Sequence, residues 1–374
     1  MSIDIAAAEE VFAASTDGTV GLEEEFAILD PATLDLVPRF ELLRDSAPPE
    51  LAPQLAGELI ASEIEIVSGR GEDFADALAR QRRGRRLLVA HAHDHGLLLG
   101  ATGTHPWADY REQPNIDTDH YRRVVTELGY AARRNNSFSL HVHVGVRGIE
   151  RAIAVCDRLR PVLPLLLAAS ASSPFLERQD TLLHSARSEI FTRTFPRCGV
   201  PDAFGSWAAY REYIELLVRT SSIVEFTQVW WSVRPHFSFG TVEVRICDAQ
   251  PSADESDALA ALIVAVVNAA ARDHDAGVPF ADPPSRLIEE NVWRAIRYGM
   301  DGRLIDLERG EEVEARTALE RLATWAGHDL TLPAANGAQR QRALFNDGAS
   351  LQDVYAAIVE ETRSTYGRAA EPIS

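Results

Sequence analysis

The sequence predicts an α+β protein built on a largely antiparallel sheet that is flanked by helices. Strand-like segments occur in groups along the chain rather than in strict alternation with helices, which argues against a parallel βαβ arrangement. Four segments alternate apolar with ionisable residues, as expected for a sheet that packs one face on the core and keeps the other face polar.

Local patterns place the expected elements in chain order. Short apolar runs bounded by turn residues predict strands, whereas Ala, Leu and Arg at helical spacing predict helices. The expected strands lie within residues 19–29, 59–69, 95–105, 137–146 and 236–248. The expected helices cover residues 74–95, 150–170, 207–218 and 254–273.

No repeat, low-complexity block or linker divides the 374 residues, so one main domain is expected. We place it at residues 1–286. Residues 287–374 are rich in Glu and Arg at helical spacing, and we expect a helical C-terminal region that packs on the same domain.

The charged residues exclude several classes of function. A formal net charge of −19 argues against nucleic acid as a partner, because affinity for phosphate backbones comes from clustered cations. All 37 basic residues are Arg, so there is no Walker-A lysine and no Schiff-base lysine. Any bound phosphates must be neutralised by Arg and by metal ions.

Cysteine usage and hydropathy predict a soluble cytoplasmic protein. Cys156, Cys198 and Cys247 are widely spaced, which suits neither a disulfide framework nor a CxxC metal site. The acidic N-terminus lacks the basic start of a signal peptide, and no apolar run reaches about 18 residues. We therefore expect no membrane partner.

Carboxylates in two segments share strand faces. In the first strand, Glu23 and Glu25 lie on the face opposite to Leu22 and Phe26, and two such carboxylates repel each other unless a cation lies between them. The second segment supplies Glu58, Glu63 and Glu65; a helical approach to the strand would bring Glu58 and Glu65 to one side. A solvated acidic edge is the alternative interpretation for both segments.

His141 and His143 share one face of an otherwise apolar strand. This geometry is typical of an inward-facing metal or phosphate site, although two satisfied core histidines are the alternative. One imidazole among carboxylates would suit Mg²⁺ or Mn²⁺, and two would favour Zn²⁺. The pattern leaves open which of the two His residues binds.

Glu243 and Arg245 share a face of the last strand, and Arg234 and His236 lie just upstream. A metal-binding carboxylate beside a guanidinium is the pairing that phosphoryl transfer needs in a chain without lysine. A cross-strand ion pair is the alternative. Together the four segments predict a charged floor on one sheet face, whose fitting ligand is a nucleotide triphosphate with several Mg²⁺ ions.

These motifs resemble the YbdK-like carboxylate-amine ligases, the glutamate–cysteine ligase type 2 family. The likeness covers most of the chain and rests on the motifs in this order. They are GLEEEF at 21–26, EIEIVSG at 63–69, ATGTHPW at 101–107, LHVHVGV at 140–146, RPHFSFGTVEVRICD at 234–248 and ENVWRAIRYGMDG at 290–302.

The resemblance implies a glutamine-synthetase-like catalytic domain whose curved antiparallel sheet carries metals and ATP. It also implies that ATP phosphorylates the side-chain carboxylate of glutamate or a similar acid, and that cysteine or another amine attacks the acyl phosphate. By position, the implied metal ligands are Glu23, Glu25, Glu58, Glu65, His141 or His143, and Glu243. The implied phosphate-side groups are Arg245, Arg234 and His236, and the implied substrate-side groups are Arg187, His105, Arg123 and Arg294. The same family resemblance leads us to expect a homodimer, the commonest form of symmetric assembly.

The chain departs from the family in one stretch. Family members usually read NSPFWEGRDTGxASYR where residues 172–187 read SSPFLERQDTLLHSAR, so the Asn, both Gly and the Tyr are absent. Glu63 also stands where Gln is common. These departures predict an acceptor pocket that differs from that of the relatives, and an amine other than cysteine becomes an alternative.

Two other enzyme classes compete with the ligase. A phosphagen-kinase-like phosphotransferase would use a related sheet and stop after phosphorylating its acceptor. A zinc hydrolase would use His141 and His143, but the many carboxylates and the absence of an HExxH helix argue against it.

Overall fold

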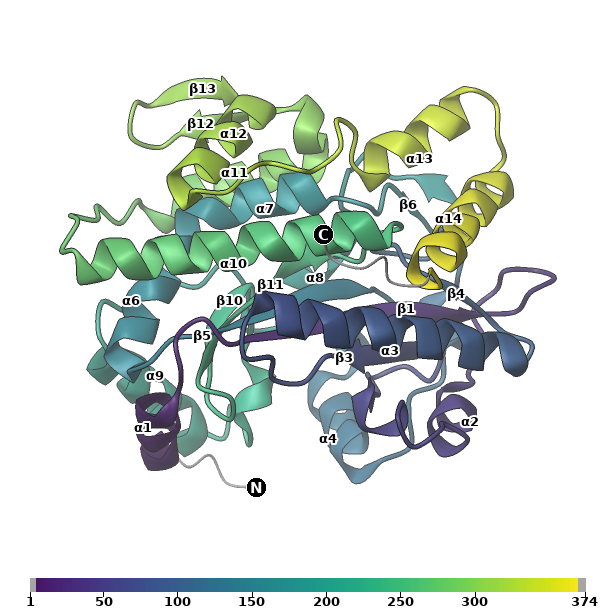
Figure 1. Ribbon diagram of the computed structural model, residues 1–374, viewed down its shortest axis with the longest axis horizontal. Coiled ribbons are helices and arrows are strands. Elements are labelled where there is room, and N and C mark those ends of the chain that lie inside the picture. Colours follow the sequence, from purple (N-terminus) through teal and green to yellow (C-terminus); the bar gives the residue numbers. More distant parts are fainter. Residues whose placement is uncertain (1–4, 369–374) are drawn as a thin grey trace.

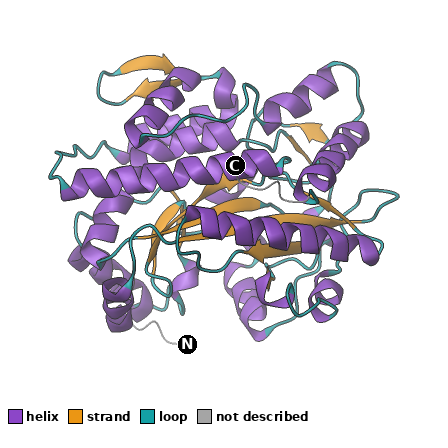
Figure 2. Cartoon of the chain, viewed as in Figure 1, coloured by secondary structure: helices purple, strands orange, loops and turns teal. Residues whose placement is uncertain are grey.

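One antiparallel sheet forms the centre of the protein in this computed structural model, which describes residues 5–368 (Figure 1, Figure 2). Seven strands belong to it, in the order β10-β11-β5-β1-β3-β2, with β4 pairing to β1 beyond the end of β5, on the edge opposite to β3. Its strands are β1 (Val20–Leu29), β2 (Leu55–Ala56), β3 (Glu63–Val67), β4 (Leu98–Gly100), β5 (Ser139–Gly145), β10 (Val233–His236) and β11 (Thr241–Asp248). The predicted α+β class with an antiparallel sheet is confirmed.

Helices cover one face of this sheet. In Figure 1, α3 (Phe74–Asp94) lies in front of β1 and β3 and runs in nearly the same direction as β1, and α10 (Ala253–Asp275) lies above it. The helix α3 packs on β1 and β3, and α10 packs on β5. The remaining helices are α1 (Ile5–Ala14), α2 (Phe40–Asp45), α4 (Asp119–Leu128), α5 (Tyr130–Arg133), α6 (Ile149–Leu159), α7 (Leu163–Ser170), α8 (Ala186–Thr194), α9 (Trp207–Arg219), α11 (Ser285–Tyr298), α12 (Ala315–Ala326), α13 (Gly337–Asn346) and α14 (Leu351–Tyr366).

The largest core cluster lies between the sheet and these helices. Alternate residues of β5, Leu140, Val142 and Val144, are buried there with α10 residues such as Leu259 and Ile263. Because successive side chains of a strand point to opposite faces, the intervening His141 and His143 must face away from this core. The apolar pattern that predicts the strand therefore also determines where its polar residues point.

The helix predicted over residues 150–170 is interrupted, which corrects that expectation. The helix α6 ends at Leu159, a 3-10 turn covers Arg160–Val162, and α7 begins at Leu163. Pro161 and Pro164 explain the break, because proline lacks the backbone N–H and its ring clashes with the preceding turn. The two halves still pack on the sheet, through contacts of α6 with β10 and of α7 with β11.

The C-terminal region contributes to the same core. Residues of α11 and α12, among them Ile296 and Leu319, belong to the largest cluster, and Tyr366 of α14 belongs to the cluster beside α3. The region is not wholly helical, because β12 (Arg303–Asp306) and β13 (Glu311–Glu314) form a hairpin. Its turn contains Gly310 at φ 69°, a conformation that glycine adopts without strain. Where the main domain ends stays a prediction.

Three pairs of short strands lie outside the central sheet. Besides the β12-β13 hairpin, β6 (Phe175–Leu176) pairs with β7 (Gln179–Asp180), and β8 (Cys198–Gly199) pairs with β9 (Trp230–Trp231). None of the described helices is long and apolar enough to cross a membrane. Residues 1–4 of the acidic N-terminus and residues 369–374 of the expected C-terminal region lie outside the described residues.

Candidate active site

A cavity of about 340 Å³ lies on the sheet face opposite to α3 and α10. Its floor comes from β1, β3, β5, β10 and β11, and its walls come from the segments around α4, α8 and β9. Of the residues predicted for the site, the cavity is lined by Glu23, Glu25, Glu58, Glu65, His141, Glu243, Arg245, Arg234, His236 and Arg187. Segments that are far apart in the sequence thus converge on one cavity.

Strand register brings these side chains into rows across the sheet. Glu23 on β1 lies opposite His141 on β5, and Glu243 on β11 lies opposite both His143 on β5 and Arg234 on β10. On the other side of β1, Glu25 lies opposite Glu65 on β3. Residues that are directly opposite in an antiparallel pair have side chains close enough to interact.

Glu58 reaches the cavity by a route that differs from the expected helical approach. The short strand β2 pairs with β3, with Ala56 opposite Glu65, and Glu58 follows two residues after Ala56. A hairpin-like return of the chain therefore brings Glu58 beside Glu65. Glu58 lines the same cavity as Glu65, so the expectation that they share one side is confirmed although the helix is wrong.

Glu23 lies between the two imidazoles. His141 Nδ1 is 3.1 Å from Glu23 Oε2, and His143 Nε2 is 3.1 Å from Glu23 Oε1. Burial alone would raise the pKa of Glu23, but the charge of His143 and hydrogen bonds from both rings outweigh it, so the pKa lies well below the usual value. Glu23 is therefore ionised.

The two His residues differ in their surroundings. Burial, together with the positive charge of Arg245, lowers the pKa of His141, which favours the neutral ring. Burial also acts on His143, but the charges of Glu23 and Glu243 outweigh it and raise the pKa of His143. Both groups of three residues whose ligand atoms lie within 4.8 Å of one another include His141; these groups are Glu23, His141, Glu243 and Glu25, Glu65, His141.

Glu243 is paired with two guanidinium groups. Arg234 Nε donates to Glu243 Oε2 at 2.6 Å, and Arg245 Nη1 donates to Glu243 Oε1. Burial would raise the pKa of Glu243, but these two arginines hold it well below its usual value. Arg234 also donates to the carbonyls of Thr227 and Val229, whereas Nε of Arg245 has no partner among the described residues.

The carboxylates nearest β3 have no comparable cation. Burial and the charge of Glu25 raise the pKa of Glu58 to about 8. Burial and neighbouring carboxylates likewise raise the pKa values of Glu63 and Glu65 well above the usual value. The cavity therefore has a side at β10 and β11 where arginines neutralise a carboxylate, and a side at β3 where the carboxyl groups retain their protons unless a cation binds.

Arg187 and His236 occupy other parts of the cavity wall. Arg187 on α8 donates to the carbonyls of Arg245 and Ile246, while its buried Nε has no partner among the described residues. Burial lowers the pKa of His236 to about 3, so this ring is neutral. The His236 ring stacks on Phe239, with centroids 4.2 Å apart.

Three predicted substrate-binding residues do not line the cavity, and the structure assigns their side chains elsewhere. The buried His105 has Nε2 2.8 Å from the carbonyl of Leu34. Arg294 on α11 pairs with Glu290 and Glu312. Arg123 is exposed on α4, whose residues Tyr121 and Val124 form the wall instead. A substrate contact for these three residues stays a prediction, which the lining of this cavity does not support.

The altered stretch at residues 172–187 also lies differently than expected. Only Arg187 of this stretch is among the cavity-lining residues, so the replaced positions do not shape the cavity. Two of them explain the usual glycines: Arg178 has φ 67° and Leu182 has φ 59°, in the left-handed region that disfavours residues with a Cβ. The replacement of these two glycines therefore affects the conformation of the turns rather than the lining of the cavity.

Sequence patterns missed part of the wall. Ser139 lies two residues before His141 on β5 and so on the same face, which the alternation could have revealed. Gln228 and Trp230 come from a 3-10 turn and a two-residue strand that carry no periodic pattern. Phe191 and Phe195 of the α8 segment form apolar wall, again without a signal that local sequence provides.

Comparison with known proteins agrees with this geometry. Residues 19–365 match glutamate-cysteine ligase family 2. A relative from Rubrobacter xylanophilus named "Putative glutamate--cysteine ligase 2-2" is 39% identical over 370 residues, covering 95% of this chain and 94% of the relative. A "Putative glutamate--cysteine ligase 2" from Solibacter usitatus is 36% identical over 366 residues, covering 92% of this chain and 93% of the relative.

Solved structures share the fold at low sequence identity. A bifunctional glutathione synthetase from Pasteurella multocida superposes with a TM-score of 0.69 at 12% identity, and the match covers 96% of this chain but only about half, 54%, of that protein. A glutamate–cysteine ligase from Francisella tularensis, solved in complex with AMP, gives a TM-score of 0.65 at 11% identity, covering 95% of this chain and 91% of that chain.

Proposed function

Because the chain belongs to glutamate-cysteine ligase family 2, and is thus a carboxylate-amine ligase of the glutamate–cysteine ligase type, we propose how its cavity performs the reaction. ATP phosphorylates the side-chain carboxylate of glutamate or a similar acid. The acyl phosphate is then attacked by the amine of cysteine or of another small molecule, which releases phosphate and leaves a γ-glutamyl-type amide. The substrates ATP, acid and amine all meet in the cavity above β1.

The separation of charge within this one cavity carries the proposal. Phosphoryl transfer to a carboxylate brings two anions together, so the site must offer positive charge where the phosphoryl group moves. Arg245 and Arg187 each keep an Nε–H without a protein partner, and both line the cavity. We assign Arg245 to the transferring phosphoryl group and Arg187 to the acid substrate.

The carboxylates fit divalent cations. Several carboxylates lie together with raised pKa values, and buried charges of this kind are stable in proteins when they coordinate metals. The proposed Mg²⁺ or Mn²⁺ ligands are Glu23, Glu25, Glu58, Glu65, His141 and Glu243. Bound ions would supply the positive charge that offsets repulsion between the triphosphate and the substrate carboxylate.

The other residues hold this arrangement in place. Arg234 fixes the Glu243 carboxylate through Nε and Nη2, and its own position is held because Nη1 binds backbone carbonyls. His143 pairs with Glu23, and the neutral His236 forms the wall beside Phe239. Apolar walls from Phe191, Phe195 and α4 exclude water, which protects an acyl phosphate until the amine arrives.

A phosphate-release assay of the purified protein with Mg·ATP against a matrix of acids and amines tests this function. The ligase forms ADP and phosphate only when an acid and an amine are both present. Formation of ADP and a stable phosphorylated acid without any amine would instead support a phosphagen-kinase-like phosphotransferase. Activity that requires zinc but no ATP would support a hydrolase.

Two further parts of the proposal concern the cellular location and the oligomeric state of the protein. The described cysteines Cys156, Cys198 and Cys247 are all free thiols, which supports a reducing cytoplasmic location. A homodimer follows from the family resemblance and from the frequency of closed symmetric pairs. Light scattering during gel filtration measures its mass.

A further inference from the structure

Glu63 is a buried carboxylate in the cavity wall for which the proposed function has no role. Its side chain is 0% exposed, no N–H group or cation among the described residues pairs with Oε1 or Oε2, and its close neighbour is the carboxyl group of Glu25, which raises the pKa of Glu63. Glu63 lies on β3 two residues before Glu65 and therefore on the same face of the strand. Its cross-strand neighbour on β1 is Ala27, which is too small to reach its carboxylate.

An ionised carboxylate in this position is costly unless something pairs with it, because burial without a partner costs several kcal/mol. The arginines and imidazoles at the cavity contact other groups: Arg234 and Arg245 bind Glu243, and the two imidazoles contact Glu23. Arg187 pairs with Asp248. Without a ligand Glu63 holds a proton, and a positive partner for its ionised carboxylate has to come from a ligand.

We propose that Glu63 binds a divalent cation, as an additional carboxylate ligand beside Glu25, Glu58 and Glu65 on the β3 side of the cavity. This inference rests on the proposed function, because it adds a ligand to the metal-binding part of the same site. Carboxylate oxygens are the ligands that Mg²⁺ and Mn²⁺ prefer.

The number of charges favours a divalent ion over an ammonium group. Four carboxylates line this side of the cavity: Glu25, Glu58, Glu63 and Glu65. Each divalent ion offsets two of these charges, whereas the ammonium group of an amino acid offsets one. One ion can also contact several neighbouring carboxylate oxygens at once, since Mg²⁺ and Mn²⁺ take six oxygen ligands in an octahedral site.

A titration of the nucleotide-free protein with Mn²⁺ tests the inference. Electron paramagnetic resonance measures the binding, because the signal of free Mn²⁺ decreases when the ion binds. We expect Glu63→Gln to weaken one class of Mn²⁺ site by about 10-fold or more, since even ligand-supporting residues change metal affinity by about 10- to 100-fold. The matched control is Glu177→Gln at an exposed position outside the cavity, which should bind Mn²⁺ as the wild type does.

Thermal unfolding gives a second readout, because Glu63→Gln should affect the Tm differently in the absence and in the presence of metal. Without metal, Glu63→Gln removes an unpaired buried carboxylate, so its Tm should equal or exceed that of the wild type. With saturating Mg²⁺, the rise in Tm should be smaller in Glu63→Gln than in the wild type. Glu63→Asp keeps the charge on a shorter side chain and should bind Mn²⁺ with intermediate affinity.

The outcomes separate this inference from the proposed function. A wild-type Mn²⁺ isotherm for Glu63→Gln, with weakened binding in Glu65→Gln, overturns the role of Glu63 and leaves the proposed function standing. An unchanged isotherm combined with a raised KM for one amino substrate also overturns it, because Glu63 would then contact an ammonium group. If neither Glu63→Gln nor Glu65→Gln alters Mn²⁺ binding, the metal assignment of the proposed function fails as well.

Discussion

Arg85 of α3 donates to both carboxylate oxygens of Glu24, from Nε to Oε2 at 2.6 Å and from Nη2 to Oε1 at 2.8 Å. Glu24 is the residue of β1 between Glu23 and Glu25, and it points to the opposite face of the sheet. Arg85 also pairs with Asp257 of α10 at 2.5 Å. One strand thus carries carboxylates to the cavity on one face and is tied to two helices on the other.

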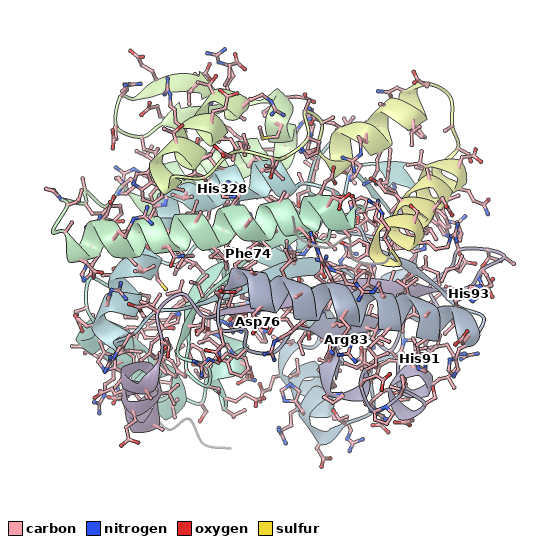
Figure 3. The ribbon with its side chains drawn as sticks, viewed as in Figure 1. Phe74, Asp76, Arg83, His91, His93 and His328 are labelled. Carbon is pink, nitrogen blue, oxygen red and sulfur yellow. The ribbon has the colours of Figure 1, made fainter. Side chains whose placement is uncertain are left out.

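This buried ion pair supports the strand behind the site. Side-chain exposures of 3% for Arg85 and 4% for Glu24 leave almost no water to replace a lost partner. We expect Arg85→Met to lower the free energy of unfolding by about 3–5 kcal/mol, because it leaves a buried charge uncompensated. Urea unfolding measures this value. Arg83, which Figure 3 labels on the same helix, is exposed, and Arg83→Met should change stability by less than about 0.5 kcal/mol.

Glu25 offers a test of the metal assignment with little risk to the fold. Glu25 Oε2 accepts a hydrogen bond from the backbone N–H of Ser139 at 2.5 Å, and a Gln side-chain oxygen can accept the same bond. We expect Glu25→Gln to reduce ATP turnover at least about 100-fold, since the variant loses one anionic metal ligand. Its circular dichroism spectrum and Tm should match those of the wild type. Wild-type turnover in this variant would contradict the role of Glu25.

Metal-free protein should lose stability as the pH rises. Burial and mutual repulsion raise the pKa of Glu58 to about 8 and raise those of Glu63 and Glu65 well above the usual value, whereas in the unfolded chain these groups titrate near the ordinary value of 4.5. The folded protein therefore holds protons that the unfolded chain has released. The stability from these groups is complete below about pH 4.5 and is lost as the pH rises through the folded-state pKa values.

Differential scanning fluorimetry in EDTA should accordingly give a lower Tm at pH 8 than at pH 6. Mg²⁺ should raise the Tm more at pH 8, because metal binding requires deprotonated ligands. The lowered pKa values of Glu23 and Glu243 do not affect this window, since such groups lose their stabilising charge only at more acidic pH. Equal Tm values in EDTA at the two pH values would contradict the carboxylate cluster.

Arg187 should affect the acid substrate more than ATP. We expect Arg187→Lys to raise the KM for the acid by about 10-fold, because a lost hydrogen bond to a charged group costs about 1.5–3 kcal/mol, while the KM for ATP changes little. Steady-state kinetics with each substrate varied in turn measure both values. Arg193→Lys, on the exposed part of the same helix, is the control. A larger change for ATP than for the acid would reverse the assignment of Arg187.

Leu182 tests the strained turn. Its φ of 59° is unfavourable for a residue with a Cβ, and its side chain is 57% exposed, so little packing is lost on its removal. We expect Leu182→Gly to raise the free energy of unfolding by about 1 kcal/mol. The exposed Leu344 lies in α13, and Leu344→Gly should instead lower it by about 1 kcal/mol. A loss of stability in Leu182→Gly would show that the side chain compensates the strain.

The alternation of residues in the strands predicted much of the site. It placed Glu23 with Glu25, His141 with His143, and Glu243 with Arg245 on common strand faces, and all of these residues except His143 line the cavity. His143 still contacts Glu23 from the adjacent row. His105, Arg123 and Arg294 do not line the cavity, and their assignment came from motif position alone rather than from the alternation of strand faces.

The sequence by itself determined which side chains leave each strand on the polar face, because that depends only on the two-residue period of an extended backbone. The tertiary structure alone decided the partners: Glu23 opposite His141, Glu243 between two arginines, Glu24 against Arg85, and Glu63 beside Glu25 with no cation from the described part of the chain. Register and burial join residues that are far apart in the chain, and the charge state of each group depends on those neighbours. No local pattern contains that information.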